Sequence, residues 1–227
     1  MSHSIQIKRL GFLYLAGGTS QRMGEHKSQL LFDDRTLLER ALFDVIHKNK
    51  IDAATISDCV INLPSALDGA IDQSLFSSSN ECLISVVYDA RADGPLGGLA
   101  DSFKLFESRK LDAVLVYACD TLILPSSLAR LLLKTFMING RSVYLEHQTS
   151  IFPLIGMYRL EDLQQAQQAL MSGQHRVMAW LAELDAQSIT APDAWSDYLQ
   201  FNTPDEYAAA KVSYRTSTIN DSSFTSI

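Results

Sequence analysis

The sequence predicts an α/β domain with a mainly parallel sheet, and two observations lead to this fold class. Short apolar runs alternate with segments of helical periodicity, which is the pattern of repeated strand–helix–strand units. The first apolar run, Gly11 to Leu15, leads directly into a glycine-rich segment that ends at Lys27. A strand that feeds a loop of small residues with exposed backbone N–H groups is typical of phosphate-binding domains.

The expected strands are short apolar runs bounded by polar or turn-forming residues. They are Gly11 to Leu15, Asp58 to Asn62, Leu83 to Tyr88, Ala113 to Ala118, Ser142 to Leu145 and Pro153 to Tyr158. Apolar residues at helical spacing predict helices between them. These begin near Thr36 and after the glycine-rich segment 89–98, and then cover Ser126 to Phe136, Glu161 to Met171 and Val177 to Leu184.

The chain length of 227 residues suits one domain, which we expect to span residues 1–211. Its last helix begins at a predicted capping box, with Thr203 as N-cap, Pro204 at the first helical position and Glu206 at the third. From Ser213 the sequence is polar without periodicity, so residues 212–227 are expected to form a disordered tail. The stretch Pro64 to Asn80 predicts a weak helix and a mobile loop.

Composition narrows the class of function. The net charge of −7 argues against a general nucleic-acid binder but is compatible with a nucleotide site, where a few local cations suffice. No apolar run approaches a membrane span, and the first run continues into the glycine loop rather than a cleavage site. Cys59, Cys82 and Cys119 are widely spaced in apolar contexts, which favours buried free thiols over a disulfide or metal site. We therefore expect a cytoplasmic protein with neither nucleic-acid nor membrane partners.

The glycine-rich loop, residues 15–27, reads LAGGTSQRMGEHK. Gly17 and Gly18 allow the backbone to approach an anion, and Arg22 and Lys27 supply positive charge. The loop is neither a Walker A motif, which has Lys directly after Gly, nor GxGxxG, because its first two glycines are adjacent. A plain turn with two solvated cations is the alternative interpretation.

Polar residues follow the ends of several expected strands: Asn62, Asp89 and Asp120. In a parallel sheet ligands bind outside the carboxyl ends of the strands, so these residues are expected at one edge. A carboxylate at the position of Asp120 suits Mg²⁺, which binds one or two carboxylates together with substrate phosphates. The alternatives are a helix cap for Asp120, a turn residue for Asp89 and a simple strand end for Asn62.

Other candidate residues are few. The histidines show no metal-ligand spacing, and neither a hydrolase triad nor a GxSxG elbow is present. Arg176 follows Gly173 in a loop before an expected helix. It is interpreted equally well as an anion-binding group or as a solvated charge.

Five ordered motifs, within residues 8 to 211, resemble those of nucleotidyltransferases that use a sugar or pterin phosphate as acceptor, and molybdenum cofactor guanylyltransferases above all. The glycine-rich loop resembles the family signature LAGG-x-S-x-R-M-G-x-x-K. The other four segments are similar to the family's D…GPLAG, CDTPFLP, AGERRV and NxNTPEEL, and they are Asp89 with residues 94–98, residues 119–121 with Pro125, residues 172–177 and residues 201–206.

The resemblance implies a three-layer Rossmann-like nucleotidyltransferase fold and transfer of GMP from GTP to a molybdopterin-type cofactor, with release of pyrophosphate. Mg²⁺ would be the cofactor, and molybdenum-insertion or molybdoenzyme chaperone proteins would be partners. The implied sites are a GTP pocket at Leu15, Ala16, Gly17 and Gly18, phosphate contacts from Lys27 with Arg22, a guanine and ribose end at Asn62 and Asp89, a metal ligand at Asp120, and a pterin side at Arg176 and Asn202.

Four positions depart from the family pattern: His26, Leu122, Phe152 and Gln200 stand where the family usually has Asp, Pro, His and Asn. Most of them fall near the supposed acceptor side or metal edge. The related cytidylyltransferases, sugar-phosphate nucleotidyltransferases and a catalytically silent GTP-binding relative therefore remain alternatives. Gly17, where cytidylyltransferases usually have Ala, favours guanine.

Overall fold

The computed structural model describes residues 6–16, 23–67, 82–89 and 93–222, with only the helical backbone for 218–222. Its centre is an eight-stranded sheet with the order β10-β8-β9-β7-β1-β5-β4, in which β6 also pairs with β5. The pairings among β6, β5, β1 and β7 are parallel, whereas β9 runs antiparallel to β7 and to β8. The predicted α/β fold with a mainly parallel sheet is confirmed.

The strands of the sheet follow the predicted runs, with small shifts at the ends. They are β1 Arg9–Leu15, β4 Lys50–Ile51, β5 Ala54–Pro64, β6 Leu83–Asp89, β7 Ala113–Ala118, β8 Val143–His147, β9 Ser150–Tyr158 and β10 Gln187–Thr190. The sequence analysis missed β4, β10 and the small hairpin of β2 (Leu31–Phe32) and β3 (Arg35–Thr36). These elements are too short, or too polar, to show an apolar period of two.

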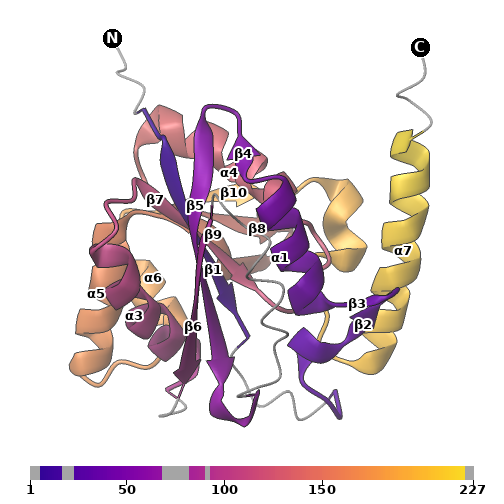
Figure 1. Cartoon of the computed structure of the whole chain (residues 1–227), viewed down its shortest axis with the longest axis horizontal. Coiled ribbons are helices and arrows are strands. Elements are labelled where there is room, and N and C mark those ends of the chain that lie inside the picture. Colours follow the sequence, from indigo (N-terminus) through magenta and orange to yellow (C-terminus); the bar gives the residue numbers. More distant parts are fainter. Residues whose placement is uncertain (1–5, 17–22, 68–81, 90–92, 223–227) are drawn as a thin grey trace.

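Helices cover both faces of the sheet and give three layers (Figure 1). On one face lie α3 Gly94–Glu107, α5 Leu160–Met171 and α6 Val177–Glu183, and on the other lie α1 Leu37–His47 and α4 Pro125–Asn139. Successive side chains of β1 pack alternately on the two faces of the sheet. Phe12 and Tyr14 belong to the core on the α1 side, and Leu13 and Leu15 to the core on the α3 side.

The predicted start signals of two helices are confirmed. Thr36 and Glu39 form a reciprocal capping box at the start of α1. Thr203 and Glu206 do the same at the start of α7 (Pro204–Ser222). The α4 helix begins at Pro125 after the N-cap residue Leu124, which rules out the alternative interpretation of Asp120 as a helix cap.

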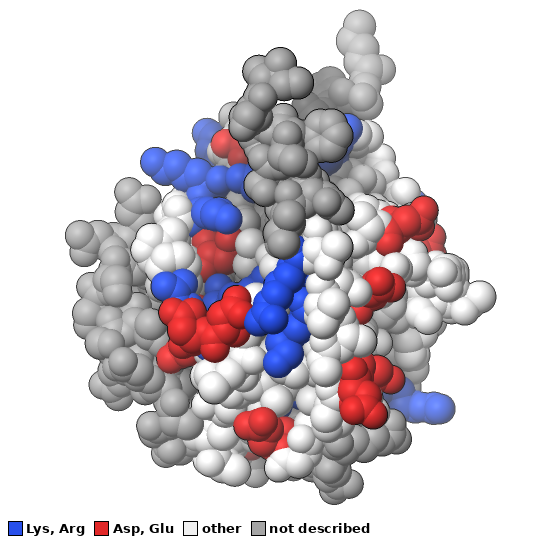
Figure 2. Space-filling model, turned by 90° about the vertical axis from the view of Figure 1, so that its right-hand side faces the viewer, with Lys and Arg blue, Asp and Glu red and all other residues white. Residues whose placement is uncertain are grey.

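The expectation of a disordered tail from Ser213 is wrong for the part that the structure describes, because α7 continues to Ser222. The Tyr214 ring packs edge-on against Phe32 of the hairpin and against Tyr198. Arg215 pairs with Asp33 at the tip of the same hairpin. The C-terminal part of α7 contains few apolar residues, so its sequence shows little of the apolar periodicity that predicts a helix. Both basic and acidic side chains are exposed on this face of the molecule (Figure 2).

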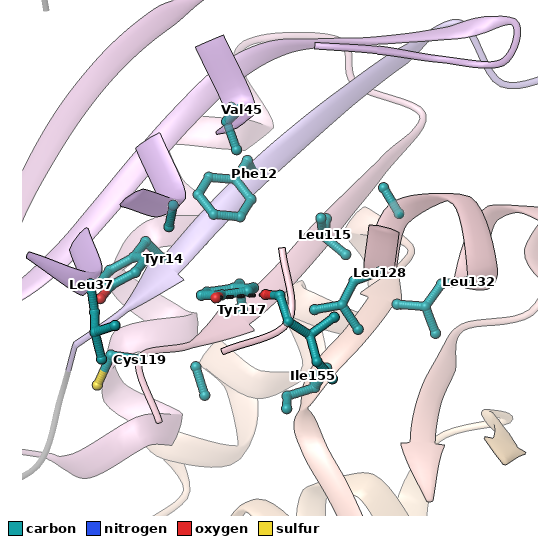
Figure 3. Close-up of a cluster of buried hydrophobic side chains, with 14 of the residues drawn as sticks. Phe12, Tyr14, Leu37, Val45, Leu115, Tyr117, Cys119, Leu128, Leu132 and Ile155 are labelled. Carbon is teal, nitrogen blue, oxygen red and sulfur yellow. Dashed lines mark hydrogen bonds between the residues drawn. The ribbon is translucent and has the colours of Figure 1, made fainter. Parts of the chain in front are cut away.

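The loop after β7 is anchored inside the core on the α1 side (Figure 3). The rings of Tyr14 and Tyr117 stack with centroids 5.7 Å apart. The Tyr117 hydroxyl donates a hydrogen bond of 2.9 Å to the carbonyl oxygen of Ile123. The three cysteines are buried and free, as predicted. Of the stretch Pro64 to Asn80, the structure describes a short 3₁₀ helix, η2, at Ser65–Leu67, and residues 68–81 lie outside the described part.

None of the described helices is both long enough and apolar enough to cross a membrane.

A substitution at Gly156 would test how tightly the sheet is packed. A Cβ at this position would lie 2.6 Å from the carbonyl oxygen of Val143, a backbone atom that cannot move without disturbing the sheet. We expect Gly156→Ala to lower the free energy of unfolding by about 1–3 kcal/mol in urea denaturation. Gly11→Ala is the matched control, because its Cβ would meet side-chain atoms, the nearest being Leu111 Cδ1 at 2.8 Å, and the loss should be smaller. Equal losses would contradict this account.

Candidate functional site

The strand-end residues singled out in the sequence meet at one edge of the sheet, the lower edge in Figure 1. Leu15 at the end of β1 pairs with Asn62 of β5 on one side and with Ala118 of β7 on the other. Asp89 at the end of β6 lies across from Pro64. Asp120 follows β7 by two residues. The predicted convergence at the carboxyl edge is therefore present.

The glycine-rich loop is described only at its two ends. Gly17, Gly18 and Arg22 lie outside the described residues. Leu15 and Ala16 are buried, and the backbone N–H of Ala16 donates to the carbonyl oxygen of Asn62 at 2.9 Å. The first described residue after β1 is therefore bound to β5 close to the carboxyl edge.

Asn62 carries a buried polar group that has no hydrogen-bond partner. Its side chain is 1% exposed, and its Nδ2 atom has no hydrogen-bond partner in the structure. The α3 helix packs Gly98 against it, since a Cβ at Gly98 would lie 2.8 Å from Asn62 Oδ1. A buried donor without a partner is costly, by about 1–3 kcal/mol, so a ligand that accepts a hydrogen bond here would bind favourably.

Lys27 and Asp120 form the charged centre of the site. Lys27 begins the 3₁₀ helix η1, Lys27–Gln29, and its Nζ lies 3.3 Å from Asp120 Oδ2. The same ammonium donates to the carbonyl oxygen of Phe201 at 2.9 Å and to Asn202 Oδ1 at 3.0 Å. Gln200 Nε2 also donates to Asp120 Oδ2, at 3.2 Å. Residues far apart in the sequence therefore surround one carboxylate.

Backbone hydrogen bonds hold the segment that carries Gln200 and Asn202 against the loop after β7. The N–H of Phe201 donates to the carbonyl oxygen of Asp120 at 3.0 Å, and that of Leu122 donates to Tyr198 at 3.1 Å. The sequence motifs indicated Asp120 and Asn202 separately. They did not indicate that both side chains contact the ammonium of Lys27. Tyr198, which ends the 3₁₀ helix η3 (Asp193–Tyr198), was not predicted as part of the site.

Arg40 is a second contributor that sequence reasoning missed. Its Nη1 donates to the carbonyl oxygen of Leu122 at 2.8 Å, and its guanidinium lies 4.8 Å from the Phe32 ring and 4.7 Å from the Tyr214 ring. It thereby joins α1, the hairpin, α7 and the loop beyond Asp120. Nothing in the sequence distinguishes Arg40 from any other charged position on a helix.

The donor set around Asp120 suits a hard cation. Carboxylate, amide and backbone carbonyl oxygens all lie within reach, and Mg²⁺ binds through few protein oxygens together with substrate phosphates. Burial raises the pKa of the neighbouring Cys119 thiol to about 12, so it stays protonated at neutral pH and is a poor metal ligand. Among the described residues, no group of three or more His, Cys, Asp or Glu side chains is arranged to hold a metal ion.

A cavity of about 260 Å³ opens beside Asp120. Phe152, Gln200 and Val177 line it, so two of the four departures from the family pattern face this space. Arg176, directly before Val177, is exposed, and the structure does not bring it into contact with Asp120. The other two departures lie elsewhere: Leu122 is fully buried, and His26 Nδ1 is 2.8 Å from Ser28 Oγ.

Comparisons with known proteins identify the family. Residues 12–188 match the family model of the MobA-like NTP transferase domain. A probable molybdenum cofactor guanylyltransferase from Synechococcus elongatus is 28% identical over 205 residues, covering 88% of this chain and 97% of the relative.

Two solved structures share the fold. Molybdopterin-guanine dinucleotide biosynthesis protein A from Archaeoglobus fulgidus has a TM-score of 0.61 at 16% identity, covering 90% of this chain and 97% of that one. The 4-diphosphocytidyl-2C-methyl-D-erythritol synthase from Anaerococcus prevotii has a TM-score of 0.67 at 10% identity, covering 92% and 96%.

Removal of Arg40 tests the link between α1 and the loop after β7. Arg40→Ala deletes a charged hydrogen-bond donor and two cation–π contacts, so we expect a loss of about 2–4 kcal/mol in the free energy of unfolding, measured in urea. The control is Arg35→Ala, because Arg35 lies 3.8 Å from the Phe43 ring and donates no hydrogen bond to the loop. A similar small loss, below about 1 kcal/mol, in both variants would show that the Leu122 contact contributes little.

Proposed function

Because this chain belongs to the MobA-like NTP transferase family, we propose that it transfers GMP from GTP to the phosphate of a molybdopterin-type molybdenum cofactor. An oxygen of the acceptor phosphate forms a bond to the α-phosphorus of GTP. The bond from that phosphorus to the bridging oxygen of the β-phosphate breaks, and pyrophosphate leaves. The products are the guanine dinucleotide form of the cofactor and pyrophosphate.

The observation that carries the proposal is the juxtaposition of Lys27 and Asp120 at the carboxyl edge of β1 and β7, with their charged atoms 3.3 Å apart. A carboxylate that can hold a cation and an ammonium that can contact phosphates suit nucleotidyl transfer at this edge, since catalysis depends on alignment and charge neutralisation. Asp120 would bind Mg²⁺, which supplies charge neutralisation at the reacting phosphates. Lys27, with Arg22, would neutralise the phosphates.

The remaining roles follow the positions in the site. Asn62 and Asp89 would contact the guanine and ribose, since Asn62 offers the unsatisfied Nδ2 donor. Leu15, Ala16, Gly17 and Gly18 would form the phosphate side of the GTP pocket. Asn202 and Arg176 would face the acceptor, whose ring would enter the cavity lined by Phe152.

A transfer of CMP is the second candidate, and the fold likeness to a 4-diphosphocytidyl-2C-methyl-D-erythritol synthase motivates it. Two further alternatives to GMP transfer are the transfer of a nucleotide to a sugar phosphate and the binding of a nucleotide without turnover. Delivery of the product through molybdenum-insertion proteins or molybdoenzyme chaperones is a further part of the proposal that follows from the cofactor class.

The direct test is pyrophosphate release with Mg²⁺ and molybdopterin-loaded acceptor, comparing GTP, CTP and ATP. We expect release with GTP alone. Asp120→Asn should lower the rate by at least about 100-fold, because it removes the carboxylate that would hold Mg²⁺ at the reacting phosphates. Asp185→Asn, at an exposed ion pair with Arg141, is the control and should leave the rate unchanged. Release with CTP alone would show that the protein transfers CMP and not GMP. No release with any nucleotide would overturn the proposed reaction.

A substitution of Asn62 distinguishes an effect on nucleotide binding from an effect on folding. Asn62→Ala removes the unsatisfied donor, which favours the folded state, and leaves a small cavity, which disfavours it, so the melting temperature without nucleotide should change little. The thermal shift produced by GTP should fall, because a ligand stabilises only in proportion to its affinity for the folded state. Differential scanning fluorimetry with and without GTP checks both parts. A GTP-induced shift equal to that of the wild type would remove Asn62 from the nucleotide site.

A further inference from the structure

The Lys27 ammonium sits in a cage of oxygen atoms. Asp120 Oδ2 lies 3.3 Å from Nζ, Asn202 Oδ1 3.0 Å and the carbonyl oxygen of Phe201 2.9 Å. The side chains of Lys27 and Asp120 are only 13% and 17% exposed, so the contact is largely shielded from water. Carboxylate, amide and backbone carbonyl oxygens are also the ligands of a hard divalent cation. The structure thus places a protein cation where a metal ion would be coordinated.

We propose that Lys27 acts as a resident cation in the nucleotide-free protein and occupies the place of the divalent metal at Asp120. The metal binds tightly only when the phosphates of the nucleotide draw the ammonium away from the carboxylate. This inference rests on the proposed function for the identity of the nucleotide. It goes beyond that function by assigning Lys27 two alternative partners and an order of events.

Charge balance supports the exchange. Asp120 carries one negative charge, and the adjacent ammonium neutralises it. A divalent ion approaching the same oxygen meets a like charge a few ångströms away, and it must also displace the hydrogen bond from Gln200 Nε2 at 3.2 Å. A triphosphate changes this balance, because its oxygens provide an anionic partner for Lys27 and additional ligands for the metal.

The side chain of Lys27 is suited to such an exchange. A lysine ammonium is a compact point charge on a flexible four-carbon stem, so it moves between partners while its backbone stays in η1. The oxygens of Phe201 and Asn202 belong to a segment fixed by backbone hydrogen bonds to the Asp120 loop. The carbonyl oxygen of Phe201 therefore stays beside Asp120 when the ammonium leaves.

The exchange makes metal and nucleotide binding cooperative. Each ligand removes an obstacle to the other, and the coupling must be the same in both directions. The wild-type protein is expected to bind a divalent metal weakly when alone and more tightly with a nucleotide present. Loss of the Lys27 charge should remove the obstacle and raise the affinity of the nucleotide-free protein for metal.

The test measures Mn²⁺ binding by electron paramagnetic resonance, without acceptor and without turnover. In nucleotide-free protein, Lys27→Met should bind Mn²⁺ at least about tenfold more tightly than the wild type, within the usual range of site coupling. Lys27→Gln serves as a second, polar variant in case the apolar one disturbs folding, which circular dichroism checks. Lys104→Met is the matched control, since Lys104 pairs with Asp101 on α3, and it should show wild-type binding.

Two further comparisons make the outcome decisive. A non-hydrolysable GTP analogue should tighten Mn²⁺ binding to the wild type, and the gain in Lys27→Met should vanish in the Lys27→Met/Asp120→Asn double variant. Unchanged Mn²⁺ affinity in both Lys27 variants, or a gain that survives the loss of Asp120, would overturn the inference. Because no acceptor is used, the exchange is supported or refuted independently of whether GMP is transferred to molybdopterin.

Discussion

The site depends on backbone hydrogen bonds between two distant parts of the chain. The segment from Tyr198 to Asn202 is hydrogen-bonded to the loop that follows β7, through the N–H of Phe201 and the carbonyl oxygen of Asp120. This contact brings Gln200 and Asn202 to the carboxylate and completes the oxygen cage around Lys27. Without it, Asp120 would keep Lys27 but lose Gln200, and the ammonium of Lys27 would lose the oxygens of Phe201 and Asn202.

The rest of the structure supports that contact from outside the site. The Tyr207 hydroxyl of α7 donates to the carbonyl oxygen of Leu31, so the last helix holds the hairpin that directly follows the Lys27 turn. Arg40 ties the same hairpin and α7 to the loop beyond Asp120. Helix α7 therefore contacts the hairpin that follows Lys27 and, through Arg40, the loop that follows Asp120. These contacts give α7 a structural role despite its polar sequence.

The two ends of the site differ in chemistry. Toward β5 and α3 it offers Asn62, a buried amide that lies against Gly98 in close-packed surroundings. On the other side of Asp120 it opens into a cavity with mostly apolar walls, including Phe152. A nucleotide base recognised by hydrogen bonds and a ring held by apolar contact would suit these two ends, with the phosphates between them at Asp120 and Lys27.

The sequence by itself determined the fold class, most strands and helices, and the carboxyl edge where Asn62, Asp89 and Asp120 gather, because hydrophobic periodicity and strand ends are local properties. It did not determine the partners of these residues. The Lys27–Asp120 pair joins positions 93 residues apart, and the Arg40 and α7 contacts involve single side chains with no periodic pattern. Only the tertiary structure decides such pairings, because they depend on how separate elements pack and not on the residues next to them in the chain.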